Sequence, residues 1–158
     1  MRSFLFTFIV LLASVWVYAQ DLTRIDGKFY KNGMLYTGTH IEYYDNGKKR
    51  SEQSFRNGVY DGKSSFYYEN GLVKEERHYQ EGRKNGLWLT FNSEGIKTGE
   101  AWYTNDLKDS TWRIWDDKGR LRYEMHYQKG VKTGKWVMWN ENGDILQVKD
   151  YGNGENPE

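Results

Sequence analysis

The chain has 158 residues, of which 17% are aromatic and only 37% hydrophobic, and its formal net charge is +1. This length suits one ordinary domain, and an aromatic-rich, aliphatic-poor composition favours a thin pleated sheet over a thick core. No lysine- or arginine-rich run stands out, which argues against a nucleic-acid interface. The sequence has no cysteine, which excludes disulfides, a lipid anchor on cysteine, thiolate catalysis and cysteine metal sites.

Residues 1–19 have the layout of a cleavable secretory signal. Arg2 forms a short basic start, an apolar run covers residues 4–17, and the segment ends at Ala19, after which the chain turns polar. The run is shorter than the roughly 18–20 residues needed to cross a bilayer. The alternatives are an uncleaved membrane anchor or a buried N-terminal helix. The pattern predicts a secreted or periplasmic protein that is cleaved after Ala19.

From Gly38 onward the chain repeats itself in blocks of 24 residues. The five blocks start at Gly38, Gly62, Gly86, Ser110 and Gly134. Nine residues into each block lies a glycine: Gly47, Gly71, Gly95, Gly119 and Gly143. Seventeen residues in lies an aromatic residue: Phe55, Tyr79, Tyr103, Tyr127 and Tyr151. A fixed period of this kind indicates a repeat architecture in which each unit contacts mainly its neighbours. With a partial unit before Gly38, the array is assigned to residues 30–154, between a lead-in at 20–29 and a tail at 155–158.

Each unit reads as a β-hairpin, because two short strands flank a turn that contains glycine. In the last unit an aromatic strand at 135–139 precedes the turn at Gly143, and a second strand runs to Tyr151. Asn-Gly dipeptides, which recur at such turns, are the strongest short hairpin signal. Two units carry Glu94 or Lys118 before the turn glycine, and these residues disfavour positive φ. We therefore predict a three-residue loop with glycine in the left-handed conformation.

This strand register also predicts which residues share a face. It places Trp115 opposite Leu121 and Trp139 opposite Ile145. In the second strand of the fourth unit, one face carries Leu121, Tyr123, Met125 and Tyr127, and the other carries Arg122, Glu124 and His126. Trp88, Trp112 and Trp136 are expected on the second face, although a slip of one residue would exchange the faces. The predicted fold is all-β: an elongated, open antiparallel β-meander of tandem hairpin repeats in a single-layer twisted sheet.

The polar residues do not predict a metal or catalytic site. His78 and His126 share one repeat column but lie two units apart, roughly 19 Å, which is too far to share a zinc ion. A column of glutamates is formed by Glu52, Glu76, Glu100 and Glu124. Solvated glutamates on a sheet face explain this column, with Lys49, Lys74, Lys97 and Arg122 as their expected charge partners. We therefore predict no catalytic residues, no metal and no cofactor.

The aromatic residues are the remaining candidates for a binding site. Trp88, Trp112 and Trp136 recur in one column, and Trp102 occupies the column of His78 and His126. One interpretation is structural, with the tryptophans covering the sheet. The other is a groove for a peptide, a glycan or a lipid headgroup, because large exposed apolar patches usually mark binding sites. The first two units have His40 and Ser64 at the tryptophan column, and this asymmetry favours a C-terminal binding patch.

The segment that links successive units reads aromatic-x-x-Gly-x-x-x-Gly-x-Trp, as in Tyr79, Gly82, Gly86 and Trp88. This pattern resembles the MORN repeat, specifically its bacterial variant with an Asn-Gly-Lys type of turn, over about residues 30–154. The resemblance implies an interaction module without cofactor or catalytic residues. Members of this family are linked to membrane association, protein scaffolding and, in some bacteria, an antitoxin label.

The sequence thus predicts an exported, non-enzymatic interaction or scaffold module that binds a protein or an envelope component. One alternative is a protein that binds carbohydrate or another envelope polymer, with hydrolytic activity through the glutamate column. Another is an antitoxin-like partner of a toxin, although an antitoxin must meet its toxin in one compartment. Self-association is a further option, because terminal units present unpaired strand edges.

The signal segment is directly testable. Protein recovered after export should begin at Gln20, because the small-residue end of the apolar run lies at Ala19. N-terminal sequencing measures this. Exported protein that still begins at Met1 would show that the segment is not a cleaved signal.

Overall fold

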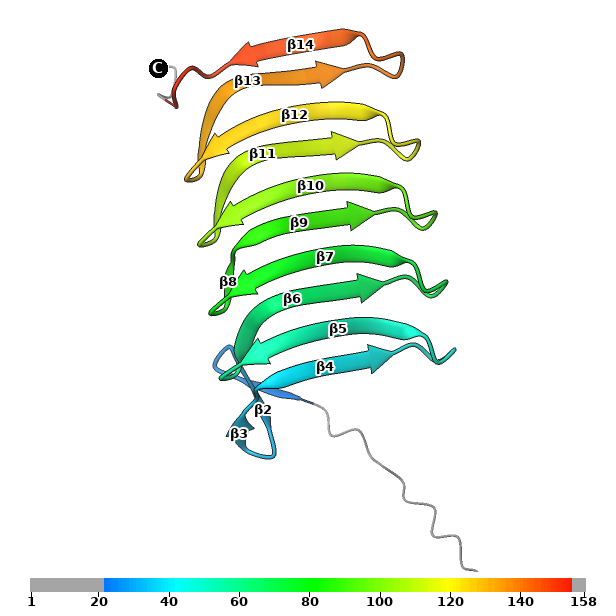
Figure 1. The fold of residues 1–158 in the computed structure, drawn as a ribbon, viewed down its shortest axis with the longest axis vertical. Coiled ribbons are helices and arrows are strands. Elements are labelled where there is room, and N and C mark those ends of the chain that lie inside the picture. Colours follow the sequence, from blue (N-terminus) through cyan, green and yellow to red (C-terminus); the bar gives the residue numbers. More distant parts are fainter. Residues whose placement is uncertain (1–21, 155–158) are drawn as a thin grey trace, which may run out of the picture.

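The computed structural model describes residues 22–154, which form an open antiparallel sheet of stacked hairpins with a small second sheet at its N-terminal end (Figure 1). The main sheet follows the chain in the order β4 (Gly38–Tyr43), β5 (Lys49–Arg56), β6 (Val59–Tyr67), β7 (Val73–Gln80), β9 (Gly86–Phe91), β10 (Lys97–Thr104), β11 (Leu107–Trp115), β12 (Leu121–Gln128), β13 (Val131–Trp139) and β14 (Ile145–Asp150). A two-residue strand, β8 (Arg83–Lys84), pairs with β7. The predicted all-β meander is confirmed. Within the described range there is no helix long and apolar enough to span a bilayer. The predicted signal segment and the C-terminal tail lie outside the described residues.

Three-residue loops join the two strands of each unit, as predicted. In the first unit Gly47 N–H donates to Tyr44 O and Tyr44 N–H donates to Lys48 O, both at a distance of 2.9 Å. Gly47 has a φ of 79°, in the left-handed region that glycine enters without steric cost. The expected pairs, Trp115 with Leu121 and Trp139 with Ile145, are both present.

Two-residue turns join successive units at the opposite edge, and both of their residues have positive φ. The first is Asn57-Gly58, with φ values of 49° and 77°. The third is Asn105-Asp106, with 49° and 69°, where an aspartate takes the place of glycine. Asp106 Oδ1 accepts a hydrogen bond from Lys84 N–H at 2.8 Å, so its side chain ties this turn to the preceding unit.

The sheet has almost no interior. Among the described residues, the buried apolar side chains are Phe55 and Tyr127, which are 4% and 8% exposed, and the buried polar ones are Ser51, Ser64 and Ser65. Contacts run mainly between strands that are adjacent in the sheet. This is the arrangement expected for a single layer whose units contact only their neighbours.

A separate three-stranded sheet precedes the array and contains β1 (Thr23–Ile25), β2 (Lys28–Lys31) and β3 (Met34–Leu35). The expected start of the array at residue 30 therefore falls within β2. Phe29 N–H donates to Gly58 O at 2.8 Å, and the Phe29 ring lies 4.7 Å from that of Phe55. These contacts attach the small sheet to the first unit of the array.

Ser110 provides a test of the backbone geometry at the block starts. Its φ is 53°, close to the 57° of Gly134 in the same repeat column. A residue with a Cβ in this conformation costs about 1–2 kcal/mol. Replacing Ser110 by glycine removes this strain, but glycine also gives the unfolded chain more conformational freedom, which offsets part of the gain. The net result should be a rise of about 1 kcal/mol in the free energy of unfolding. Urea denaturation measures the change.

The matched control is Gly134→Ser, which should lower the free energy of unfolding by a similar amount. A Cβ added at Gly134 would meet no atom closer than 3.8 Å, so the substitution tests backbone strain rather than a clash. A Ser110→Gly protein that is less stable than the wild type would contradict this explanation.

Candidate functional site

The three tryptophans of the repeat column lie on a different face from the one expected. Trp112 is directly opposite Met125 in the β11–β12 pair, so it shares a face with Met125 and Tyr127. We call this face A, and the opposite face, which carries Glu124 and His126, face B. The expectation that these tryptophans lie with Glu124 and His126 was wrong. A bulge explains the error: Arg122 is an extra residue opposite Trp115, and it shifts all later pairs by one.

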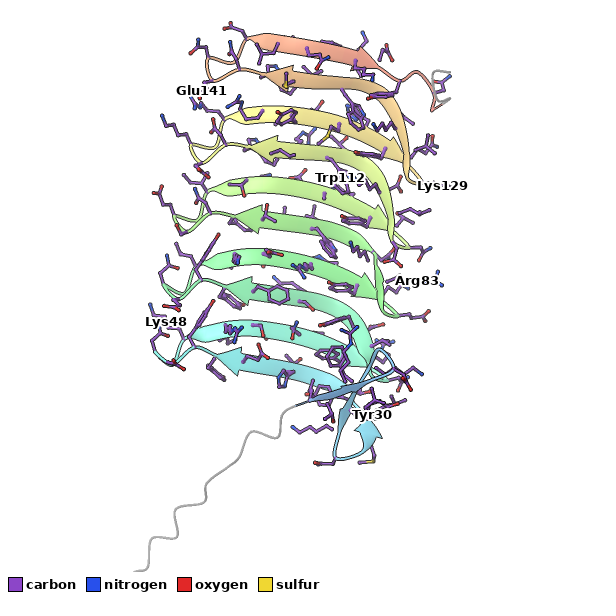
Figure 2. The ribbon with its side chains drawn as sticks, turned by 180° about the vertical axis from the view of Figure 1, so that it is seen from behind. Tyr30, Lys48, Arg83, Trp112, Lys129 and Glu141 are labelled. Carbon is purple, nitrogen blue, oxygen red and sulfur yellow. The ribbon has the colours of Figure 1, made fainter. Side chains whose placement is uncertain are left out.

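A continuous row of aromatic rings, the aromatic ladder, runs along face A from one end of the array to the other. Its members in spatial order are Phe29, Phe55, Tyr60, Tyr79, Trp88, Tyr103, Trp112, Tyr127, Trp136 and Tyr151. Successive ring centroids are 4.7–5.4 Å apart. Most of the rings meet at a tilt, which is a favourable geometry for aromatic pairs. Figure 2 shows Trp112 near the edge where Arg83 and Lys129 lie, away from the edge that carries Lys48 and Glu141.

The first two units keep the ladder continuous without a tryptophan. Each of the last three units has a lysine and, four residues later, a tryptophan. At the same two positions the second unit has Tyr60 and Ser64. The Tyr60 ring lies 4.8 Å from Phe55 and 4.9 Å from Tyr79 and so bridges the gap. Ser64 is completely buried, and its hydroxyl has no hydrogen-bond partner. Packing therefore explains why the second unit has no tryptophan in this column.

Each tryptophan of the ladder is also held by a hydrogen bond. The indole N–H groups of Trp88, Trp112 and Trp136 donate to backbone carbonyls of the neighbouring strand that precedes each of them in the sheet. Each of these hydrogen bonds is 3.0 Å long. The ammonium groups of Lys84, Lys108 and Lys132 each lie 4.5–5.2 Å from two ring centroids. These are cation–π distances. The rings are therefore covered by lysine and by one another.

Burial in the ladder changes the acidity of its tyrosines. It raises the pKa of the Tyr79, Tyr103 and Tyr127 phenols above the ordinary value of 10.0. Because the folded state favours the neutral phenol, this contribution to stability is present below pH 10 and is lost as the pH rises through the raised pKa values. The phenols of Tyr79, Tyr103 and Tyr127 are thus neutral at physiological pH.

The other three candidate residues lie on face B, so the six do not form one site. His78 Nδ1 lies 2.7 Å from Leu87 O, and His126 Nδ1 lies 3.2 Å from the Thr111 hydroxyl. Trp102 is 41% exposed. Within the described range no three His, Asp or Glu side chains converge in a way that could hold a metal ion.

The glutamate column lies on face B in a network of ion pairs. Lys49 Nζ lies 2.7 Å from Glu52, and Lys97 Nζ lies 2.7 Å from Glu100, as predicted. The other two partners differ: Lys63 pairs with Glu76, and Arg113 bridges Glu100 and Glu124. Lys74 and Arg122, the partners expected for these positions, are the extra residues of the bulges in their units, so they do not take part in the regular alternation of the strand. Arg122 Nε instead donates to Trp139 O at 2.9 Å.

Sequence reasoning missed an apolar surface on the C-terminal part of face A, which we call the apolar patch. It consists of Ile114, Tyr123, Met125 and Met138. Ile114 and Tyr123 are 43% and 39% exposed, and a hollow of about 260 Å³ is lined by residues of β12, β13 and β14 that include Tyr123, Met125, Trp136 and Met138. A comparison of repeat columns would have found it, because the equivalents of Met138 and Tyr123 in the first unit are Glu42 and Ser51.

A second, more polar hollow of about 590 Å³ lies between the three-residue loops of the first two units. Two tyrosines, Tyr43 and Tyr67, line it. The charged lining residues are the basic Arg50 and Lys74 and the acidic Asp45 and Glu69. The four charged side chains are two acidic and two basic, so their formal charges cancel.

These features define a class of protein: a single-layer β repeat protein whose 24-residue hairpins are joined by an aromatic ladder. The family model described as the MORN repeat variant matches residues 36–57 and 60–81, which are the first two units of the array. These two units therefore carry the MORN repeat variant, and the later units of the array have the same turns and strand register. MORN repeats generally mediate protein or membrane interactions, and the family is typically non-enzymatic. A search of curated proteins finds no match to the chain.

The structural weight of the ladder can be measured by truncating one ring. Trp112→Ala removes ring contacts with Tyr103 and Tyr127 and the hydrogen bond to the backbone. Because the indole is only partly buried, we expect a loss of about 2–4 kcal/mol in the free energy of unfolding. Chemical denaturation gives the value.

Trp102→Ala is the matched control, because this tryptophan projects from face B and is 41% exposed. Its loss should stay within about 1 kcal/mol. Equal losses for the two variants would mean that the aromatic ladder is not what holds neighbouring units together.

Proposed function

We propose that the chain is an exported, non-enzymatic interaction module that binds a partner protein through the apolar patch. The observation that carries this proposal is the change of character along face A. Its N-terminal part carries paired polar groups, such as Glu42 with the Ser51 hydroxyl and Glu75 with Arg77, whereas its C-terminal part carries the patch. A repeat that served only its own stability would have no reason for this gradient.

The chemistry of the patch suits a protein ligand. Methionine and tyrosine are enriched at protein interfaces, where flexible thioethers and rigid amphipathic rings adapt to a partner surface. The hollow beside Met138 offers a place for one apolar side chain, and Gln147 and Lys149 line it as polar neighbours. An exposed apolar surface with a polar rim is the usual form of such a binding site.

The alternatives find less support in the same geometry. Glycan binding through stacking needs open ring faces, but the ladder rings are tilted against one another and lie beneath lysines. Hydrolysis through the glutamate column needs an acid with a raised pKa in a cleft. The carboxylates of that column instead form ion pairs with Lys49, Lys63, Lys97 and Arg113 on an open sheet face.

The test is a charge placed in the patch. Met138→Glu should abolish capture of the partner from the envelope fraction of the exporting cell, because an unpaired carboxylate at the interface must be desolvated on binding. The variant should fold, since the first unit has Glu42 in the same repeat column. Partner capture is measured by quantitative pull-down, and folding by circular dichroism.

Thr90→Glu is the matched control, because it introduces the same charge in the same column of the third unit, outside the patch. This variant should capture the partner as well as the wild type does. If both variants capture equally, or if both fail while remaining folded, the apolar patch is not the binding surface.

A further inference from the structure

The turn between β2 and β3 is an exposed Asn-Gly dipeptide at the N-terminal end of the molecule (Figure 1). Asn32 and Gly33 have φ values of 54° and 76°, so both are in the left-handed region. Both residues are exposed, and a Cβ added at Gly33 would meet no atom within 4 Å. Within residues 22–154, neither the Asn32 side chain nor the Gly33 N–H forms a hydrogen bond. The turn is therefore restrained only by the hairpin that carries it.

An asparagine that precedes a glycine can react with its own backbone. The glycine amide nitrogen loses its proton and attacks the side-chain carbonyl carbon of the asparagine. The new C–N bond closes a five-membered succinimide ring, and the side-chain amide group takes up a proton and leaves as ammonia. Water then opens the ring at one of its two carbonyls, which gives aspartate or isoaspartate. Glycine favours this reaction because it has no side chain and its backbone adopts many conformations.

The fold protects the same dipeptide in the turn that joins the first two units of the array. Asn57 and Gly58 have φ values of 49° and 77°, close to those of Asn32 and Gly33. Gly58 is buried, however, and its N–H donates to the backbone carbonyl of the preceding unit at 2.8 Å. A Cβ added at Gly58 would lie 2.7 Å from Leu35 Cδ2, so its neighbours leave little room for the peptide to rotate. The two turns thus differ in packing rather than in conformation.

The other Asn-Gly dipeptides of the described range are restrained as well. In the loops of the first two units, the asparagine side-chain oxygen accepts a hydrogen bond from the residue two positions later, and the glycine N–H donates to the residue three positions earlier. Asn85 Nδ2 donates to Gln80 Oε1 at 2.8 Å. The N–H groups of Gly143 and Gly154 donate over longer distances of 3.3 Å. Among residues 22–154, the dipeptide at Asn32 is therefore the one in which both reacting groups lack such a bond.

The hairpin around Asn32 is also easy to open. Attack by the glycine nitrogen requires the peptide between the two residues to rotate out of the turn conformation. Strand β3 contains only two residues, Met34 and Leu35, and they are 70% and 41% exposed. Short hairpins are marginally stable, and segments with few buried contacts open at a low cost in free energy. The reactive conformation is therefore more accessible here than in the stacked units.

We infer that Asn32 is a site of spontaneous deamidation, where the Gly33 nitrogen displaces ammonia and residue 32 becomes aspartate or isoaspartate. The site lies at the N-terminal end of the molecule, whereas the apolar patch lies on β11–β13. The inference therefore goes beyond the proposed function and does not depend on it.

Isoaspartate at this position loosens the contact between the small sheet and the array. It inserts one methylene group into the main chain, and a two-residue turn with both φ values in the left-handed region has no place for it. The residues that follow the turn carry that contact. Leu35 packs against Gly58, and Tyr36 O accepts the hydrogen bond from Gly58 N–H at 2.8 Å. Modification of one exposed turn is thus transmitted to the first unit of the array.

The first test is peptide mapping by mass spectrometry after the folded protein has been incubated in mildly alkaline buffer. The measurement follows the replacement of an amide by a carboxyl at each Asn-Gly dipeptide. Asn32 should react fastest, and at least about tenfold faster than Asn57. A protection of that size corresponds to about 1.4 kcal/mol of local opening free energy. The rate at Asn32 should rise with pH, because the Gly33 nitrogen must lose its proton before it attacks.

The matched control is the same incubation in concentrated urea. Each dipeptide follows a basic residue, Lys31 or Arg56, so Asn32 and Asn57 should react at nearly equal rates in the unfolded chain. A difference that persists in urea would mean that the sequence, and not the fold, selects the site. Equal rates in the folded protein, or a faster reaction at another Asn-Gly dipeptide, would overturn the inference.

The second test measures hydrogen exchange at the amides of Tyr36 and Gly58. Both should exchange faster in incubated protein that carries isoaspartate at position 32. Freshly purified Asn32→Asp is the control, because it adds the same charge without the extra main-chain atom. Its turn should form, since Asp26 has a φ of 47° at the equivalent position between β1 and β2. This variant should exchange like fresh wild type, and an isoaspartate form that exchanges equally slowly would contradict the loosening of the first unit.

Discussion

A single-layer sheet has no second layer under which to bury its side chains, and the structure depends on how this protein meets that constraint. The rings of the aromatic ladder bury one another along face A. Phe55, at one end of the main array, is 4% exposed, and Tyr127, within the C-terminal half, is 8% exposed. The ring contacts alternate between pairs within a unit and pairs that join successive units, so the ladder couples each unit to the next.

The repeat period follows from this dependence. Rings can meet only if every unit places its aromatic residue at the same height on the same face, which requires a constant number of residues and constant turns. Hydrogen bonds between units keep that spacing at both edges of the sheet. Gly82 N–H donates to Tyr60 O at 2.8 Å at one edge, and Asn46 Nδ2 donates to Glu69 O at 3.0 Å at the other.

Positions outside the ladder and the turns are less constrained by this spacing, and two of them differ in an informative way between units. The column of Met138 contains a glutamate in the first unit, and the column of Val148 contains glutamate in every unit but the last. At both positions the last unit has an apolar residue where the first unit has glutamate, one on face A and one in β14. A repeat scaffold can thus carry a binding surface in one unit without changing the packing that joins the units.

The sequence by itself determined the fold class, the unit length, the loop type and the pairing of Trp115 with Leu121. These features depend on local chemistry, because a glycine such as Gly119 in the left-handed conformation sets the loop within a few residues. Only the tertiary structure decided which face carries Trp112, since one extra residue in a bulge reverses the alternation of the strand. It also decided that Tyr60 fills the space left by Ser64 and that Lys63 pairs with Glu76, because both contacts join neighbouring strands and depend on how those strands lie side by side.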